Sequence, residues 1–221
     1  GTICVEREGY IQTPDDWEPL PGALDAIARI NQAGYHVVIA ANLPGLGRGL
    51  FDMAALNAIQ AKMNKQLAAV GGRVEAIFYC PHAPDEGCTC RKPLPGLFQQ
   101  IGERYKVDLR NIHAVGDSVR DVQAAAAAGC IPHLVLTGKG APVQTDPLPP
   151  EFPPGTRVHA DLAAFATAFV AEVEAQQAAA RAEADAKADR TAPALQGAEA
   201  ARHRRFHRRS CRRQRLIGAM A

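Results

Sequence analysis

Residues 112–137 read IHAVGDSVRDVQAAAAAGCIPHLVLT, in which two short apolar runs flank a segment with helical spacing. The runs, residues 112–116 and 133–137, are typical of buried parallel strands. The segment between them, residues 118–129, is closed by Gly129, a residue type that commonly follows a helix. A strand, a helix and a second strand in this order predict a βαβ unit and a parallel sheet.

The same alternation extends toward the N-terminus. Apolar runs at residues 36–41 (HVVIAA) and 76–80 (AIFYC) predict two further strands. Helical apolar spacing occurs in residues 21–34, 52–72 and 95–105. We therefore predict a Rossmann-like α/β fold, with a parallel sheet and helices on both faces. Because sites in such sheets form at the carboxyl ends of the strands, the informative residues should directly follow each strand.

The charge of the chain is unevenly distributed. Its 221 residues carry a formal net charge of +2, but residues 181–221 hold eleven Lys/Arg and four Asp/Glu, a net of +7, so the preceding chain carries −5. We predict a domain at residues 1–172 and an Ala/Arg-rich tail at 173–221, disordered or helical. Eight arginines in residues 202–215 suggest a nucleic-acid-binding arm, or else a self-repelling appendage without such a role, which we favour.

Composition argues against several classes of protein. The six cysteines are spread too unevenly for a disulfide framework in a chain of this length. No apolar stretch approaches the roughly 18 residues of a membrane helix, and the first residues do not have the pattern of a signal peptide. We therefore expect a monomeric cytoplasmic protein without membrane contact, in which clustered cysteines hold metal rather than form disulfides.

One loop, CPHAPDEGCTCRKP at residues 80–93, contains half of the cysteines. Cys80, His82, Cys88 and Cys90 have the spacing C-x-H-x5-C-x-C, in which two short pairs can converge on one ion. Thiolates and imidazole suit tetrahedral zinc, and four protein ligands leave no position for water, so such an ion is structural. The alternative is a surface loop that holds four such residues by chance.

Charged residues follow two of the predicted strands. A metal-fixed loop would hold Arg91 and Lys92 over the carboxyl edge of the sheet, where cations suit a phosphate group. Asp117 follows the strand at 112–116, where a carboxylate can bind Mg²⁺. Asp121 falls in the first turn of the next helix, where negative charge is favourable. The alternatives are a solvated basic pair and simple capping of a helix by Asp117.

Taken together, these segments resemble the haloacid-dehalogenase (HAD) superfamily of phosphatases, and more closely the D-glycero-D-manno-heptose 1,7-bisphosphate 7-phosphatases. The resemblance runs from Gly1 to about Gly140 and rests on GYIQTPDDWEPLPGALDAI, GLGRGLF, CPHAPDEGCTCRKPLPG, VGDSVRDVQAA and LVLTGKG. It implies hydrolysis of the C7 phosphate of a heptose bisphosphate in the synthesis of lipopolysaccharide sugars. Histidinol-phosphatase relatives share the zinc loop and are the nearest enzymatic alternative.

The resemblance also implies roles for individual residues. Asp117 matches an acid that helps to hold catalytic Mg²⁺, and the cysteine loop matches a structural Zn²⁺ site. Asn42 and Lys92 match phosphate contacts, and Arg91 matches a residue that grips the sugar or its second phosphate. The implied partner is a small sugar phosphate. The implied sugar-side loop contains Glu8, Gly9 and Tyr10.

The sequence departs from the family in two places. A family strand ends in Asp-x-Asp-Gly-Thr, whose aspartates act as nucleophile and as general acid and base. Gly1, Thr2 and Ile3 match the end of this motif, so we expect both aspartates upstream of Gly1 and assign no catalytic residue within the chain. We also expect the neighbours of that central strand to have unpaired edges. Ala41 replaces a hydroxyl residue that contacts the phosphoryl group, a loss of roughly 2–4 kcal/mol. A non-catalytic, zinc-stabilised remnant is therefore the alternative to the enzyme.

Overall fold

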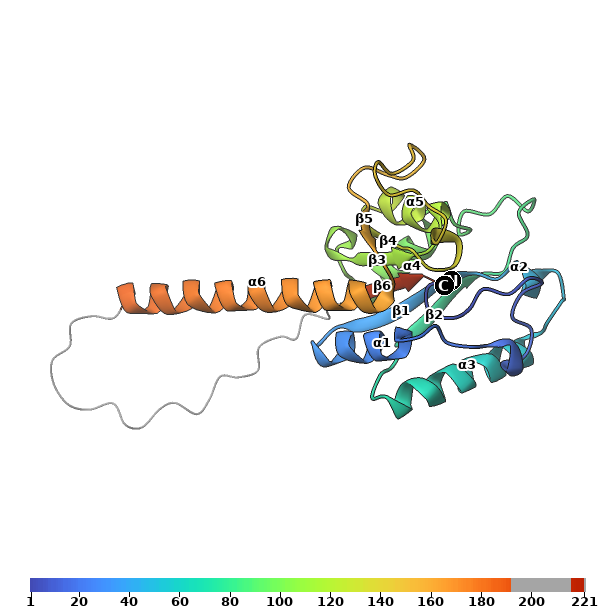
Figure 1. Ribbon diagram of the computed structural model, residues 1–221, viewed down its shortest axis with the longest axis horizontal. Coiled ribbons are helices and arrows are strands. Elements are labelled where there is room, and N and C mark those ends of the chain that lie inside the picture. The colour runs from blue at the N-terminus through green and yellow to red at the C-terminus, as the bar shows by residue number, and fades with distance from the viewer. Residues whose placement is uncertain (192–215, 221) are drawn as a thin grey trace.

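The computed structural model describes residues 1–191 and 216–220 (Figure 1). The arginine-rich stretch at residues 202–215, which we interpreted as an appendage or a nucleic-acid-binding arm, lies outside the described residues. Among the described residues, no helix combines the length and the apolar character needed to cross a membrane.

The described strands form one parallel sheet in the order β2-β1-β6-β3-β4-β5. This confirms the predicted fold class. Three strands begin and end close to the predicted positions, and β4 starts two residues earlier, because Ile131 N–H already bonds to the Ile112 carbonyl. The strands are β1 (His36–Asn42), β2 (Ala76–Cys80), β3 (His113–Gly116), β4 (Ile131–Val135), β5 (Arg157–His159) and β6 (Leu216–Met220).

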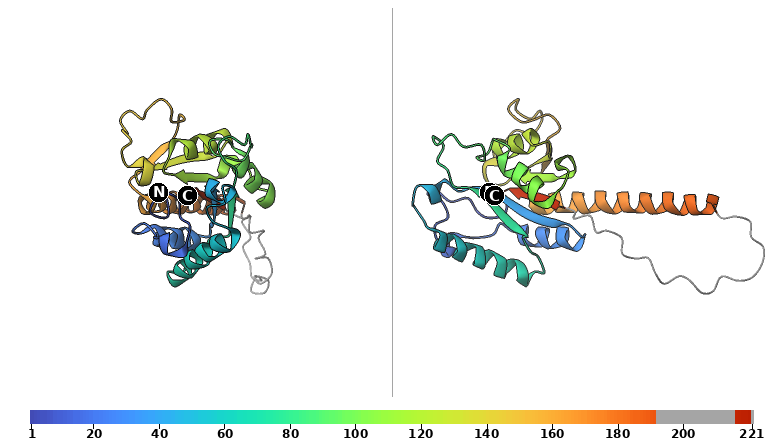
Figure 2. Two further views of the ribbon diagram at one scale, coloured as in Figure 1. Left: turned by 90° about the vertical axis from the view of Figure 1, so that its right-hand side faces the viewer. Right: turned by 180° about the vertical axis from the view of Figure 1, so that it is seen from behind.

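Helices cover both faces of the sheet, as predicted (Figures 1 and 2). One face packs its apolar residues against α1, α3 and α6, and the other against α4 and α5. The α-helices are α1 (Ala23–Gln32), α2 (Pro44–Gly47), α3 (Met53–Ala69), α4 (Gly96–Tyr105), α5 (Val119–Ala127) and α6 (Leu162–Thr191), with 3-10 turns η1 (Pro14–Asp16), η2 (Leu109–Asn111) and η3 (Gly138–Gly140).

The centre of the sheet is occupied by β6, which comes from the far end of the sequence. Its five residues pair in parallel with β1 on one side, where Leu216 lies opposite His36, and with β3 on the other, where Gly218 lies opposite Ala114. The expectation that β1 and β3 would have unpaired edges is therefore wrong. The physical reason is that the apolar run LIGAM, which we included in the tail, satisfies the backbone groups of both neighbours.

The helix α6 extends far beyond the sheet. Leu162, Phe165 and Phe169 are buried against the sheet, but from residue 178 onward the described side chains are exposed. Figure 1 shows this part as a single rod that leaves the body of the molecule. The helical alternative for the tail therefore holds for residues 173–191, while the division of the chain at residue 172 stays a prediction.

Three histidines on neighbouring strands form a ladder beneath α6. His113 Nδ1 lies 3.0 Å from His133 Nε2, and His133 Nδ1 lies 3.0 Å from His159 Nε2. Their rings pack against Phe165 and Phe169. Burial lowers the pKa of all three imidazoles, and it lowers that of His133 to about 2, since the two adjacent imidazoles and the Arg157 guanidinium also disfavour a second positive charge there. The ladder is therefore neutral in the folded protein.

Candidate functional site

A cavity of about 460 Å³ opens at the carboxyl edge of the sheet, where the sequence predicted the site. It lies between the N-terminal loop, the ends of β1 and β3, and the loops that follow β2 and β4. Its lining consists of polar residues, here called the polar side, and of apolar residues, here called the apolar side. The apolar side, which the sequence analysis did not identify, includes Trp17, Phe51, Leu56, Ile59, Met63 and Ile77.

The polar side is built around a buried ion pair. Lys92, whose side chain is 3% exposed, places its Nζ 2.7 Å from Asp121 Oδ1 and donates to the Ala40 carbonyl at 2.7 Å. Asp121 Oδ2 accepts from the Ser118 hydroxyl at 2.7 Å and from the Ser118 backbone N–H at 3.0 Å. Because an ammonium carries three donors, Lys92 has one left to direct at a ligand.

Asp121 stays ionised in this environment. Its burial alone would raise its pKa, but the charge of Lys92 and the hydrogen bonds from Lys92 and Ser118 outweigh that effect and hold the pKa below its ordinary value. The close approach of α5 to the end of β3 depends on Gly116, since a Cβ there would lie 2.3 Å from the Asp121 Cβ. The sequence analysis placed Asp121 in the first helical turn but did not foresee its partner.

Asn42 fixes the backbone of the residue that forms this pair. Its side-chain oxygen accepts from Lys92 N–H at 3.0 Å and its amide donates to the Lys92 carbonyl at 3.1 Å. Asn42 ends β1, so these two bonds tie the loop after β2 to the neighbouring strand. The side chain lines the cavity but also holds Lys92, which a motif position alone does not reveal.

Asp117 faces the cavity from the end of β3. Its Oδ1 accepts from the Thr2 hydroxyl and its Oδ2 from Lys139 N–H, each at 3.0 Å. Gly138, in a left-handed conformation with φ +52°, passes so close that a Cβ there would lie 2.5 Å from Asp117 Oδ2. The Thr137 hydroxyl bonds to the Gly1 carbonyl at 2.6 Å. Loops after β3 and β4 and the start of the chain therefore orient this carboxylate together.

The chemistry of Asp117 fits a hard cation. A carboxylate is a preferred ligand of Mg²⁺, which takes oxygen donors. Each oxygen of Asp117 receives one hydrogen bond, which leaves acceptor capacity on both. The group thus offers one Mg²⁺ ligand on the side of the cavity that also holds Lys92.

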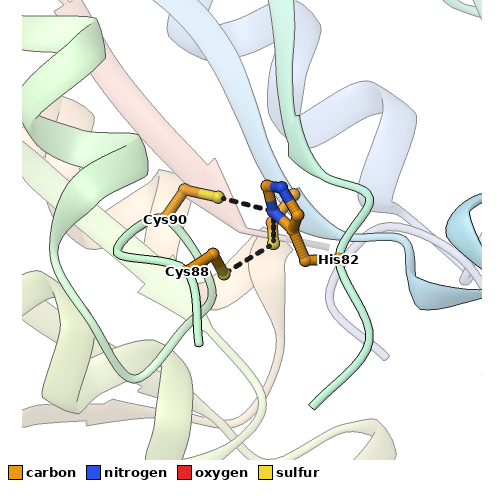
Figure 3. A group of neighbouring side chains, drawn as sticks. His82, Cys88 and Cys90 are labelled. Atoms are coloured by element: carbon orange, nitrogen blue, oxygen red, sulfur yellow. Dashed lines mark hydrogen bonds between the residues drawn. The ribbon is translucent and has the colours of Figure 1, made fainter. Parts of the chain in front are cut away.

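The four predicted metal ligands converge in the loop after β2. Their ligand atoms all lie within 4.8 Å of one another. Cys80 Sγ is 3.6 Å from Cys88 Sγ and 3.4 Å from His82 Nδ1, and Cys90 Sγ is 3.3 Å from the same nitrogen. Figure 3 shows His82, Cys88 and Cys90 pointing toward one another. Tetrahedral zinc with bonds of about 2.0–2.3 Å separates its ligands by roughly 3.3–3.8 Å. The cluster therefore fits a tetrahedral ion.

The loop that carries this cluster also carries Arg91. The Arg91 guanidinium donates to the His82 carbonyl at 3.2 Å and lines the cavity. The backbone of the loop packs closely against α2, where a Cβ on Gly47 would lie 2.2 Å from the Pro81 carbonyl oxygen. The metal cluster and the cavity are thus joined by only a few residues.

The structure brings most of the predicted site residues to one cavity. The four predicted zinc ligands form a separate cluster, and Glu8 belongs to neither group, because it is exposed and is not among the lining residues. Three contributors were missed: Lys139, Glu6 and the apolar side. The string LVLTGKG was the available signal for Lys139, and it could not show which residue meets Asp117. Those that line the cavity are Gly9, Tyr10, Asn42, Arg91, Lys92 and Asp117.

Known proteins resemble this chain over most of its length. A family model described as HAD-hydrolase-like matches residues 89–165. A D-glycero-β-D-manno-heptose-1,7-bisphosphate 7-phosphatase of Bordetella bronchiseptica is 55% identical over 166 residues, 75% of this chain and 91% of the relative. One of Pseudomonas aeruginosa is 48% identical over 170 residues, 77% and 93% of the two chains.

Solved structures give the same result. The crystal structure of D,D-heptose 1,7-bisphosphate phosphatase from B. bronchiseptica, complexed with magnesium and phosphate, has a TM-score of 0.73 and 53% identity, covering 78% of this chain and 94% of that one. The corresponding enzyme from Burkholderia thailandensis has a TM-score of 0.60 and 47% identity, covering 76% and 92%. The resemblance inferred from the motifs is thereby confirmed.

Proposed function

This chain belongs to the D-glycero-β-D-manno-heptose-1,7-bisphosphate 7-phosphatase family of HAD-like hydrolases, and from that premise we propose that its cavity binds the C7 phosphate of such a heptose bisphosphate for hydrolysis of the phosphate monoester. The observation that carries the proposal is the shared wall of Lys92 and Asp117. A fixed cation and a carboxylate that keeps acceptor capacity, both lining one cavity, suit a phosphate that arrives with Mg²⁺.

Each residue of this wall has a distinct task in the proposal. Lys92, held by Asp121 and Ala40, directs its remaining N–H at a phosphate oxygen. Asn42 keeps the Lys92 backbone in place and faces the same cavity. Arg91, at the cavity rim, contacts the sugar or its second phosphate, and Gly9 and Tyr10 border the sugar from the opposite loop.

Two metal ions belong to the proposal. Asp117 would hold Mg²⁺, which in phosphoryl transfer neutralises charge on the phosphate oxygens. Cys80, His82, Cys88 and Cys90 would hold Zn²⁺ in a closed site that fixes the loop carrying Arg91 and Lys92. We also keep the predictions of a monomer and of a cytoplasmic location.

Binding and turnover are separate parts of this proposal. The 221 residues contain no Asp-x-Asp pair, and Ala41, buried at the end of β1, has no hydroxyl to offer a phosphoryl group. We therefore expect the 221-residue chain to bind the sugar phosphate but to hydrolyse little of it. Turnover requires an Asp-x-Asp segment next to Gly1, and Ala41→Thr should then raise the rate by about tenfold or more.

The binding test is calorimetric titration of the heptose 1,7-bisphosphate with and without Mg²⁺. Asp117→Asn should weaken the Mg²⁺-dependent binding by about tenfold or more, since it removes a charged ligand. Asp15→Asn, a change of the same kind at an exposed residue outside the cavity, is the matched control. An affinity that changes neither when Mg²⁺ is left out nor in Asp117→Asn would contradict the proposal.

The turnover test is phosphate release by the 221-residue chain and by a chain in which an apolar strand ending in Asp-x-Asp precedes Gly1 and residues 216–220, which occupy the place between β1 and β3, are removed. Histidinol phosphate serves as the competing substrate. Release from the heptose bisphosphate by the extended chain supports the proposal. Preference for histidinol phosphate would favour the other branch of the superfamily. Binding without release by either chain would favour the non-catalytic remnant.

A further inference from the structure

An ion pair joins two loops across the mouth of the cavity. The Lys139 ammonium contacts the Glu6 carboxylate, although 133 positions separate them in the sequence. Both residues line the cavity. Their side chains are 51% and 41% exposed, so solvent screens the pair and the contact is weak. A weak, half-exposed pair at a cavity mouth can be exchanged for another partner.

The two members of this pair are anchored differently. Lys139 belongs to η3, and its backbone N–H bonds to Asp117, so the origin of its side chain is fixed beside the proposed Mg²⁺ ligand. Glu6 belongs to an irregular loop, residues 5–12. Tyr10 in this loop has φ +74°, an uncommon conformation for a residue other than glycine. Lys139 is thus held directly beside Asp117, whereas Glu6 lies on a loop without regular structure whose own bonds, from Val5 N–H and Arg7, go to Glu18.

The other cations at this edge have partners that differ in kind. Lys92 is neutralised by buried Asp121, Arg91 bonds to a backbone carbonyl, and Arg7 pairs with Glu18, which does not line the cavity. Lys139 differs because its partner is a carboxylate on a surface loop that itself borders the cavity. A carboxylate in that position presents to Lys139 the same charge and acceptor atoms as a phosphate oxygen.

We propose that Glu6 is a placeholder anion: in the free protein its carboxylate occupies Lys139, and a second phosphate of the bound sugar displaces it and pairs with Lys139. The inference rests on the proposed function, and it adds Lys139 as a specificity-determining residue for bisphosphates over monophosphates. Displacement of Glu6 also frees the loop at residues 5–12 to reposition Tyr10 around the sugar.

The competing explanation is that the ion pair is a tether that only ties the two loops together. The two explanations differ in the direction of the affinity changes that they predict for the two single substitutions. In the placeholder arrangement, Glu6→Gln removes a competitor and tightens binding of the bisphosphate, while Lys139→Met weakens it. In a tether, both substitutions release the same loop and change the affinity in the same direction. Glu103→Gln, a change of the same kind at an exposed acid of α4 that does not line the cavity, is the control.

The experiment titrates heptose 1,7-bisphosphate and heptose 7-phosphate into the full chain with Mg²⁺, by calorimetry and by the fluorescence of Trp17, the single tryptophan, which lines the cavity. We expect Lys139→Met to weaken bisphosphate binding by about tenfold, the scale of one lost charge-assisted hydrogen bond. Glu6→Gln should tighten it by several-fold. Both changes should be larger for the bisphosphate than for the 7-phosphate, and Glu103→Gln should alter the binding of neither by more than about twofold.

A charge-reversed protein, Glu6→Lys with Lys139→Glu, gives an independent answer. It restores an ion pair between the loops but presents a carboxylate to the ligand. Recovery of bisphosphate binding in this protein, or changes of the same sign in the two single variants, overturns the placeholder. Absence of binding of either sugar phosphate by the unsubstituted chain would instead contradict the proposed function, so the two failures are distinguishable.

Discussion

Two loops at the same edge of the sheet are ordered in different ways. The loop after β3 is held by hydrogen bonds and charge: Asp117 and Asp121 together accept four hydrogen bonds from Thr2, Ser118 and Lys139, and Asp121 also pairs with Lys92. The loop after β2 instead gathers three thiols and an imidazole whose contacts are sulfur contacts of 3.3–3.6 Å. Thiols are weak donors and acceptors, so these contacts supply little order without an ion.

The comparison shows that the two loops are ordered by different interactions. A carboxylate network carries its own order as long as every buried charge keeps its partner. A cluster of thiols has only weak contacts until a cation displaces its protons and binds the sulfurs, so its order depends on metal supply. The two loops meet at Lys92, which pairs with one and belongs to the other. This junction makes the contrast testable.

The largest expected effect comes from breaking the hydrogen-bonded loop at Lys92. Lys92→Met leaves Asp121 buried without its cation, and we expect a loss of about 3–5 kcal/mol in the free energy of unfolding. Urea unfolding monitored by circular dichroism measures it. Lys92→Met with Asp121→Leu should recover part of the loss, because no unpaired charge remains. A loss below about 1 kcal/mol in the single variant would show that this pair does not order the loop.

The second effect concerns the metal-ordered loop. We expect one zinc per chain by elemental analysis, and a stabilisation of about 2.7 kcal/mol when free zinc is 100 times its dissociation constant. Cys88→Ser should abolish this dependence, whereas Cys130→Ser, a buried cysteine outside the cluster, should keep the stoichiometry. Unfolding that is indifferent to zinc and to chelator would mean that the loop after β2 has another source of order.

A third effect separates both loops from the histidine ladder. His133 has a pKa near 2 in the folded protein, below the ordinary 6.5, so protons bind preferentially to the unfolded chain. Its contribution to stability is complete above pH 6.5 and is lost as the pH falls below that value, by roughly 1 kcal/mol between pH 6.5 and 5.5. Asp121, whose pKa is lowered, loses its contribution only below its ordinary 3.8.

As the pH falls, the contribution of the ladder to stability should therefore be lost before that of the loop after β3. The measurement is urea unfolding at the two pH values in chelator, so that metal release does not contribute. His133→Asn should flatten the difference, and His36→Gln, at a half-exposed histidine outside the ladder, should preserve it. Arg157 and Glu172 also face the ladder, and their mutual ion pair is common to all variants. Equal slopes in all proteins would exclude the ladder as the acid-sensitive element.

The smallest effect is expected at an exposed ion pair that nevertheless has several hydrogen bonds. Arg110 makes three hydrogen bonds to the Asp108 carboxylate, more than Lys92 makes to Asp121, but its side chain is 82% exposed. Water solvates both charges in the unfolded and folded states, so Arg110→Gln should leave the urea midpoint unchanged within error. A shift comparable to that of Lys92→Met would mean that burial is not what distinguishes the two pairs.

Sequence predicted the features that depend on local pattern. The apolar runs at β1, β2 and β3 lie between turn residues, and the four metal ligands lie within eleven positions, so each could be recognised from neighbours in the chain. The pair of Lys92 with Asp121 could not, because 29 positions separate them and a motif does not show which acid a lysine reaches. Lys139 and Glu6 are further apart still.

The central strand illustrates the same limit at the level of the fold. LIGAM is short and follows a long run of arginines, so its apolar character was outweighed by its surroundings. Backbone pairing with β1 and β3 stabilises this segment, and the sequence does not show that pairing because both strands are distant in the chain. The three-residue β5 was missed for a related reason, since Arg157 and His159 give it no apolar run.

The location of β6 has a consequence for biogenesis. Because it follows β3 by about a hundred residues, the ribosome delivers both of its neighbours long before the strand that joins them. Until residues 216–220 emerge, β1 and β3 lack the pairing that β6 gives them, and their edges are open to chaperones and to other chains. Synthesis rate and chaperone supply, rather than the strength of any single contact, should then govern the yield of this protein in a cell.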